Sequence, residues 1–185
     1  VEFPAFGVDL DKRGALFREN LTVLRTVLTQ NFPRIQSSYG VMQGTADLVP
    51  KPVGALPILI TGTSRQTLEW IAEHADGWIT YPRSLAQQAE RAAHWHATVM
   101  AVRPGVFTPF VQSLYIDLTT DPDHPPQPIH LGFRGGRNVL LQFLDASRRA
   151  GVNHIILNVK YGARDAAEVI DEIGGNVIPR LNAAP

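Results

Sequence analysis

The sequence predicts an α/β protein whose core is a parallel β-sheet. Two observations lead to this class. Short apolar segments alternate four times with segments of helical periodicity, and this order is typical of parallel strands joined by helical crossovers. The chain also has 185 residues, of which 44% are hydrophobic and 18% charged, and this composition is typical of a globular domain with a buried core. We therefore expect residues 1–185 to form a single domain.

The first part of the chain is predicted to be a helix followed by a long connection. Residues 30–56 contain repeated Pro and Gly, which indicates an irregular segment, and long loops often act as lids or binding loops. Residues 11–29 carry an apolar stripe at alternating spacings of four and three, which is one face of a helix. The stripe is Phe17, Leu21, Leu24 and Leu28.

The first strand–helix–strand unit is expected over residues 57–81. Residues 57–61 are continuously apolar, as expected for a strand covered on both faces. A helix over 65–75 follows, with Thr63 or Ser64 as its N-cap. The next strand is predicted over 77–81.

The second unit begins with a helix over residues 84–102. Ser84 and Gln87 have the spacing of a capping box at its start. The third strand is contained in residues 107–118, and the polar, proline-rich segment 119–128 is expected to be a loop.

The last predicted elements are two helices and a strand. A helix over 137–150 is expected to end at Gly151. The fourth strand covers 154–160, and a closing helix covers 163–173. Two glycines and a proline should then interrupt its continuation, at Gly174, Gly175 and Pro179.

Two architectures satisfy this order of elements. One is an open, doubly wound sheet, and the other is part of an eight-stranded barrel. The sequence has no GxGxxG after the first strand and no GxxxxGK[ST]. These absences weaken the open-sheet interpretations that involve nucleotide binding.

The overall composition excludes several function classes. Lys plus Arg equals Asp plus Glu at 17 each, so no electrostatic attraction to nucleic acid or an anionic membrane is expected. No apolar run approaches the roughly 20 residues of a membrane span, and the N-terminus does not resemble a signal peptide. The chain has no Cys, which fits a reducing compartment. We therefore expect a cytoplasmic protein.

A metal site is not expected. His94 and His96 are two positions apart on a predicted helix, so they point to different faces and cannot easily share an ion. Neither HExxH nor GxSxG occurs.

A group of small polar residues suggests a phosphate-binding turn. Parallel strands bring their carboxyl ends to the active face of an α/β fold, and free backbone N–H groups at the start of the next helix favour an anion. The alternative is that Thr63 or Ser64 only caps the helix, which is the commoner use of these residue types. The residues of the predicted turn are Thr61, Gly62, Thr63, Ser64 and Thr67.

The order of motifs resembles the luciferase-like monooxygenase family, the flavin- or coenzyme F420-dependent barrel enzymes related to bacterial luciferase. The segment PILITGTSRQTLEWIAEHADGWI carries this likeness, together with VPKPVGALP before it. The late GVNHIILNVKYG and VIPRL are similar to the last strand and final helix of the family. The opening EFPAFGVDLDKRGALFRENLTVLR resembles the segment after the fourth strand.

The resemblance implies the C-terminal half of a (β/α)8 TIM barrel, with about four parallel strands and their crossover helices. It also implies a flavin-dependent oxidoreductase that oxidises a small organic substrate with reduced FMN and oxygen, with coenzyme F420 as the alternative cofactor. The cofactor would carry the reaction. The rival hypothesis is a non-catalytic flavin-binding or structural half-barrel protein.

The resemblance also assigns residues to the cofactor. The flavin phosphate would contact the turn from Thr61 to Thr67, and Thr80 and Tyr81 would lie near the flavin ring or the ribityl chain. Arg134 and Arg137 would help to bind phosphate or substrate, or would belong to a solvated turn. No catalytic residue is identified.

The resemblance further predicts that the chain needs a partner. A complete barrel of this type has about 250 residues, and this chain matches only its fifth to eighth strands. We expect association with the missing N-terminal half or with a second copy.

Overall fold

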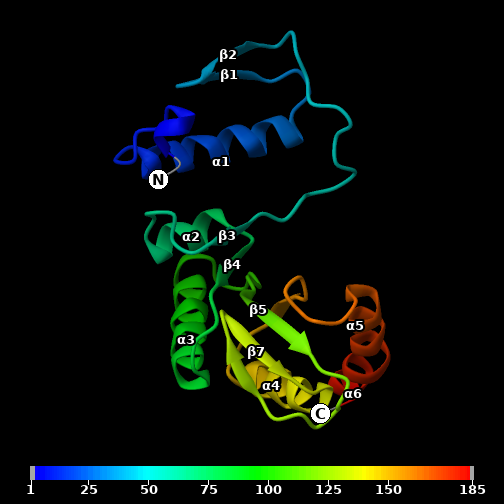
Figure 1. The fold of residues 1–185 in the computed structure, drawn as a ribbon. Coiled ribbons are helices and arrows are strands. Elements are labelled where there is room, and N and C mark those ends of the chain that lie inside the picture. The colour runs from blue at the N-terminus through cyan, green and yellow to red at the C-terminus, as the bar shows by residue number, and fades with distance from the viewer. Residues whose placement is uncertain (1–2, 184–185) are drawn as a thin grey trace. The chain divides into compact units, whose positions relative to one another are not determined.

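The computed structural model describes residues 3–183, which form two compact units (Figure 1). The N-terminal unit contains residues 3–58 and 63–67, and the C-terminal unit contains residues 59–62 and 68–183. The expected single domain stays a prediction.

The N-terminal unit contains a helix and a hairpin. The 3-10 turn Phe3–Phe6 precedes α1, Arg13–Thr29, which confirms the predicted helix. β1, Arg34–Ser37, pairs with β2, Gly40–Gln43, in an antiparallel ladder. The expectation of a wholly irregular connection was therefore wrong in its first part, because short strands around a tight turn show too little periodicity to be recognised.

Side chains of α1 and the connection hold this unit together. The Glu19 carboxylate accepts hydrogen bonds from the Ser38 amide at 2.6 Å and the Ser38 hydroxyl at 2.5 Å, and these bonds lower the pKa of Glu19. Lys51 Nζ donates to the carbonyls of Val27 and Gln30, both at 2.7 Å. These bonds attach the hairpin turn to α1 and satisfy carbonyls at its C-terminus.

The C-terminal unit contains the predicted parallel sheet. The predicted strands appear as β3, Leu59–Thr61; β4, Gly77–Thr80; β5, Phe110–Leu118; and β8, His154–Asn158. All their ladders are parallel, in the order β3, β4, β5, β8. The predicted half of an eight-stranded barrel is confirmed as a curled, mostly parallel half-barrel.

The crossover helices also follow the predicted order. They are α2, Leu68–His74; α3, Leu85–Val102; α4, Arg137–Arg149; and α5, Ala166–Glu172. Ser84 caps α3 by accepting a hydrogen bond from the Gln87 amide at 3.4 Å, as predicted. Gly151 has the left-handed conformation expected after α4, with φ of +88°.

The start of α2 differs from the prediction. Ser64 and Arg65 have φ of 47° and 59°, which a right-handed helix does not allow. The Gln66 amide instead closes a turn on the Thr63 carbonyl at 2.7 Å. The predicted start near Arg65 was therefore wrong, and α2 begins at Leu68.

The end of the chain also differs from the prediction. The closing helix does not stop at its glycines, because a π-helical turn, Ile173–Val177, joins α5 to α6, Ile178–Ala183. Pro179 is the second residue of α6, and it has no amide hydrogen to donate to a carbonyl of the preceding turn.

A second hairpin follows the segment that was predicted as a loop and includes its last two residues. β6, Gln127–Ile129, pairs antiparallel with β7, Gly132–Gly135. The predicted loop over 119–128 is confirmed as far as residue 126. Its last two residues belong to β6 instead, because β6 is short and contains Pro128, and a proline in an edge strand looks like a loop signal.

The pairing of β5 shows where this hairpin lies. Val111 pairs with residues of both β4 and β8, so these strands flank β5 on opposite edges. Tyr115 pairs with Gly132 and Asn158, so β7 shares the edge used by β4. The hairpin therefore continues the sheet at the carboxyl end of β5.

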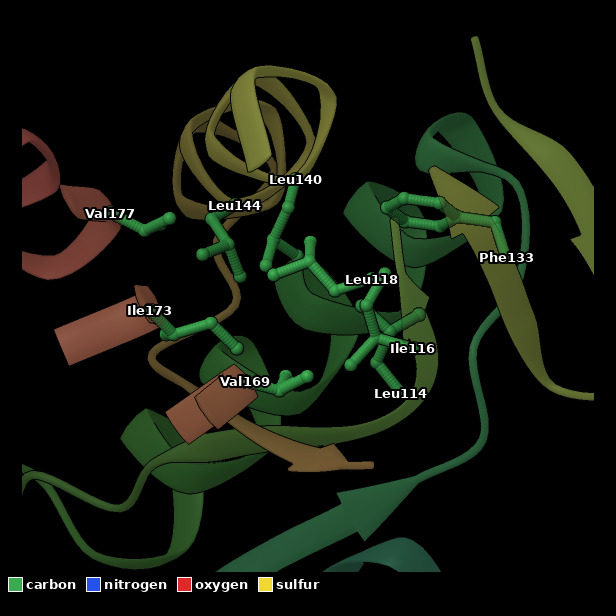
Figure 2. Close-up of a cluster of buried hydrophobic side chains, with 9 residues drawn as sticks. All are labelled: Leu114, Ile116, Leu118, Phe133, Leu140, Leu144, Val169, Ile173 and Val177. Carbon is green, nitrogen blue, oxygen red and sulfur yellow. The ribbon is translucent and has the colours of Figure 1, made fainter. Parts of the chain in front are cut away.

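The hydrophobic core lies between the sheet and its helices. Figure 2 shows Leu140 and Leu144 of α4 pointing toward Leu118 of β5, with Val169 and Ile173 approaching from the C-terminal helices. The cluster consists of Leu114, Ile116, Leu118, Phe133, Leu140, Leu144, Val169, Ile173 and Val177. Trp78 and Trp95 are also buried.

Candidate functional site

The polar residues of β5 lie on the sheet face opposite the core. Leu114, Ile116 and Leu118 are buried against the helices. Because side chains alternate along a strand, Ser113, Tyr115 and Asp117 lie on the other face, which is the inner face of the half-barrel. This alternation is visible in the sequence FVQSLYIDL, and it was the signal that could have identified these residues.

An aromatic pocket of about 440 Å³ opens at the carboxyl end of β5. Its lining residues are Tyr115, Asp117, Ile129, His130 and Tyr161. The ring centroids of Tyr115 and Tyr161 are 5.4 Å apart, and those of Tyr115 and His130 are 6.1 Å apart. His130 belongs to the connection between β6 and β7, so the hairpin forms one wall of the pocket.

Asp117 is the polar centre of this pocket. Its Oδ1 atom accepts a hydrogen bond from the Ala163 amide at 3.0 Å, and its Oδ2 atom lies 3.3 Å from Arg134 Nη1. The Asp117 side chain is 13% exposed, whereas that of Arg134 is 44% exposed. The carboxylate is therefore covered and held in place, and the guanidinium is the charged group that a ligand can reach.

A second cation lies beside the same wall. Lys160 Nζ is 5.5 Å from the centroid of the Tyr161 ring, which is a cation–π distance. With Arg134, it gives the surroundings of the pocket two positive charges against the one negative charge of Asp117. Neither cation lines the pocket itself, whose lining includes Asp117, so it is the edge of the pocket beside Arg134 and Lys160 that favours an anionic group.

Two of the predicted cofactor residues lie at the end of β3. Thr61 is exposed on the strand face that it shares with Ile79, its register partner. The Gly62 amide donates to the Ile79 carbonyl at 2.9 Å, and the Gly62 carbonyl accepts from Trp78 Nε1 at 2.6 Å. Both backbone groups of Gly62 are therefore hydrogen-bonded to residues of β4. The assignment of Thr61 and Gly62 to the flavin phosphate stays a prediction.

Three other predicted cofactor residues belong to the segment 63–67, which clusters with the N-terminal unit. Thr63 and Thr67 are exposed there, and Ser64 is half-buried. The helix that follows begins only after Thr67. The assignment of these hydroxyl groups to a flavin phosphate stays a prediction.

Thr80 and Tyr81 have different surroundings. Thr80 is buried on the helix side of the sheet, where its hydroxyl accepts from Gln88 Nε2 at 3.2 Å. The same nitrogen donates to Gln112 Oε1 at 2.7 Å. Tyr81 follows β4 and is 53% exposed. Their predicted role beside the flavin ring stays a prediction.

The structure separates the two arginines that the sequence suggested. Arg134 lies on β7 and contacts Asp117, whereas Arg137 is the first residue of α4 and donates to Glu172 at 2.9 Å. Arg164 also donates to Glu172, at 2.6 Å. Arg137 therefore belongs to a structural ion-pair network, whereas Arg134 lies beside the pocket and contacts Asp117, one of its lining residues.

The pocket fits a small planar organic ligand. Its volume is within the range of ligand sites, roughly 300–1,000 Å³, and it combines aromatic walls with few polar groups, as such sites do. Aromatic walls of this kind suit a conjugated ring such as that of a flavin or an aromatic substrate. Among residues 3–183, no group of three or more His, Cys, Asp or Glu side chains is arranged to hold a metal ion.

The fold and pocket together define an α/β half-barrel with an aromatic pocket at the carboxyl end of β5. The family model for luciferase-like monooxygenases matches residues 1–113. This match covers more than half of the chain, and the chain therefore belongs to the luciferase-like monooxygenase family.

Curated relatives match a shorter part of the chain. Uncharacterized proteins of Mycobacterium tuberculosis and Mycobacterium bovis are 37% identical over 82 residues, which is 43% of this chain and 28% of each relative. The chain therefore matches less than a third of the length of these relatives. No described helix is long and apolar enough to cross a membrane.

Solved structures share the fold over most of the chain. An F420-dependent secondary alcohol dehydrogenase has a TM-score of 0.67 at 15% identity, covering 93% of this chain and 63% of its own. A monooxygenase from Streptomyces bottropensis has a TM-score of 0.67 at 16% identity, with 97% and 65% covered. The coenzyme F420 dependent tetrahydromethanopterin reductase from Methanopyrus kandleri has a TM-score of 0.69 at 13% identity, with 91% and 63% covered. Each of these structures is longer than the matched region.

Proposed function

We propose that this chain forms the cofactor- and substrate-binding half of a flavin-dependent oxidoreductase that acts on a small organic molecule. Membership of the luciferase-like monooxygenase family supports the reaction class. The observation that carries the proposal is the aromatic pocket at the carboxyl end of β5, because active sites of β/α barrels lie at that end of the strands. FMN is the proposed cofactor.

Coenzyme F420 is the alternative cofactor. Two of the solved structures with this fold are described as F420-dependent, but identities of 13–15% support a likeness of fold alone. Direct titration with each cofactor is therefore needed to distinguish FMN from F420.

The chain's own residues would bind and enclose the reacting molecules. Reduced FMN, when bound, supplies the electrons of the reaction. Hydroxyl groups of Thr61, Thr63, Ser64 and Thr67 would donate hydrogen bonds to its phosphate, and this proposal rests on their side-chain chemistry. The aromatic walls around Tyr115 would exclude water from the substrate.

The proposed cofactor site is tested by titrating the chain with FMN and with F420 while following cofactor fluorescence. The double variant Ser64→Ala/Thr67→Ala should bind FMN at least tenfold more weakly, because a hydrogen bond to a charged group contributes about 1.5–3 kcal/mol. The control is Thr22→Ala/Thr29→Ala, which removes two hydroxyls that donate to carbonyls within α1. Equal FMN affinity of the site variant and the wild type would remove this assignment.

The second candidate function is a flavin-binding or structural half-barrel without catalysis. The share of the solved structures that the chain covers, 63–65%, favours it. Oxygen consumption with reduced FMN and a substrate distinguishes the two functions. A chain that binds FMN without any such turnover, even when the remaining half of the barrel is supplied, would establish the non-catalytic function.

A further inference from the structure

We infer that the pocket beside β5 is a substrate-binding site for a small aromatic compound that carries a carboxylate. The description of the ligand as a substrate rests on the proposed function, whereas its binding does not. The inference depends on three features of the C-terminal unit: the aromatic walls, the unused donors of Arg134 and the covered state of Asp117.

The aromatic walls select a flat ring. The rings of Tyr115 and Tyr161 meet at an interplanar angle of 48°, and His130 meets Tyr115 edge-on at 65°. Rings so arranged offer both faces and edges to a further aromatic ring, and offset or edge-to-face contacts are the favoured geometries of aromatic pairs. Ile129 adds an apolar contact. A linear polar substrate would leave these surfaces without a partner.

Arg134 selects the charged end of the ligand. Within residues 3–183, its side chain donates to Asp117 alone, through one nitrogen at the long distance of 3.3 Å. A guanidinium has five N–H donors in a fork that matches a carboxylate, so most of its donors remain for a ligand. Lys160 beside Tyr161 adds a second positive charge to this wall.

Asp117 is a positioning residue in this arrangement. It is largely covered, and the Ala163 amide holds one of its oxygens while the other faces Arg134. Asp117 therefore holds the guanidinium of Arg134 in place. Its single negative charge does not cancel both nearby positive charges, because Lys160 is also present. A cationic ligand would meet two positive groups, whereas a carboxylate would complete the bonding of Arg134.

The experiment measures the binding of benzoate and benzamide to the chain by isothermal titration calorimetry, without any cofactor. The two probes share the ring and differ in charge. Wild-type protein should bind benzoate at least tenfold more tightly than benzamide. Arg134→Met should lose this preference while it still binds benzamide, and Tyr161→Leu should weaken the binding of both probes.

Matched controls separate the site from general effects. Arg91→Met changes an exposed arginine of α3, and Tyr39→Leu changes a tyrosine that is 63% exposed in the N-terminal hairpin. Both should bind benzoate like the wild type. Tyr161 is 64% exposed, so its variant should fold even if Arg134→Met does not.

The outcomes distinguish this inference from the proposed function. Benzoate binding that is absent, no tighter than benzamide binding, or unchanged by both site variants would overturn the inference. FMN binding is measured in a separate titration, which compares the wild type with the Ser64→Ala/Thr67→Ala variant. Loss of the expected FMN binding with benzoate binding intact would overturn the proposed function alone.

Discussion

Glu172 connects three segments of the C-terminal unit through two arginines. Its oxygens accept from Arg137 at the start of α4 and from Arg164 before α5, and Arg164 also donates to the Thr119 carbonyl at 3.3 Å. Burial alone would raise the pKa of Glu172. Hydrogen bonds and charges from Arg164 and Arg137 outweigh it, so the pKa of Glu172 is below its ordinary value of 4.5.

This lowered pKa predicts a pH-dependent contribution to stability. Since the folded pKa is below the unfolded one, the contribution is complete above about pH 4.5 and is lost as the pH falls toward the folded value. Glu172→Gln should reduce the free energy of unfolding by about 1–3 kcal/mol at pH 7, and by less at acidic pH. Urea unfolding at several pH values tests this, with Asp171→Asn, an exposed neighbour, as the control. A constant difference between wild type and variant across pH would contradict it.

At the scale of elements, the hairpin of β6 and β7 depends on a close approach of two strands. A Cβ atom added at Gly132 would lie 1.7 Å from the Tyr115 carbonyl oxygen. Since β5 is packed in the core, β7 would have to move away. Gly132→Ala should destabilise the C-terminal unit by about 3 kcal/mol and should abolish benzoate binding, as thermal unfolding and calorimetry would show.

The control for this prediction is Gly174→Ala. A Cβ atom there would meet nothing within 4 Å, and the residue lies in a helical turn, where alanine is favoured over glycine by up to about 1 kcal/mol. This variant should be neutral or slightly stabilised. If Gly132→Ala unfolds like the wild type, as Gly174→Ala is expected to do, β7 does not depend on a glycine at position 132.

At the scale of the whole molecule, the half-barrel has unpaired strand edges at β3 and β8, in addition to that of the short hairpin strand β6. Among the described strands, β3 pairs only with β4, and β8 pairs only with β5. The inner face also exposes Ile156, at 42%. Open edges and exposed apolar faces recruit other strands. We therefore predict that the chain associates, with itself or with the remaining half of a barrel.

Light scattering at micromolar concentration tests this association. Ile156→Lys should shift the chain toward monomer, because it places a charge on the inner face. Ile170→Lys is the matched control, since Ile170 is 59% exposed on α5 and should leave association unchanged. A wild-type monomer with a cooperative melt would contradict the prediction.

The sequence by itself determined the class of fold and the order of its principal elements. Strands such as β5 were predictable because apolar runs and alternation are local signals, and the helix start at Ser84 was predictable because a cap is a local motif. The turn after β3 was recognised as a special segment, but its left-handed residues Ser64 and Arg65 were not predicted. Only the backbone path of the folded chain shows where α2 begins.

The tertiary structure alone decided the composition of the pocket. Asp117 meets Arg134 and the Ala163 amide across separations of 17 and 46 residues, and Tyr115 meets Tyr161 because β8 ends beside it. No periodicity in the sequence records such contacts, because strand register and the position of the β6–β7 hairpin establish them. Periodicity encodes which face of an element is buried, whereas the residues that share a site depend on which elements the fold places side by side.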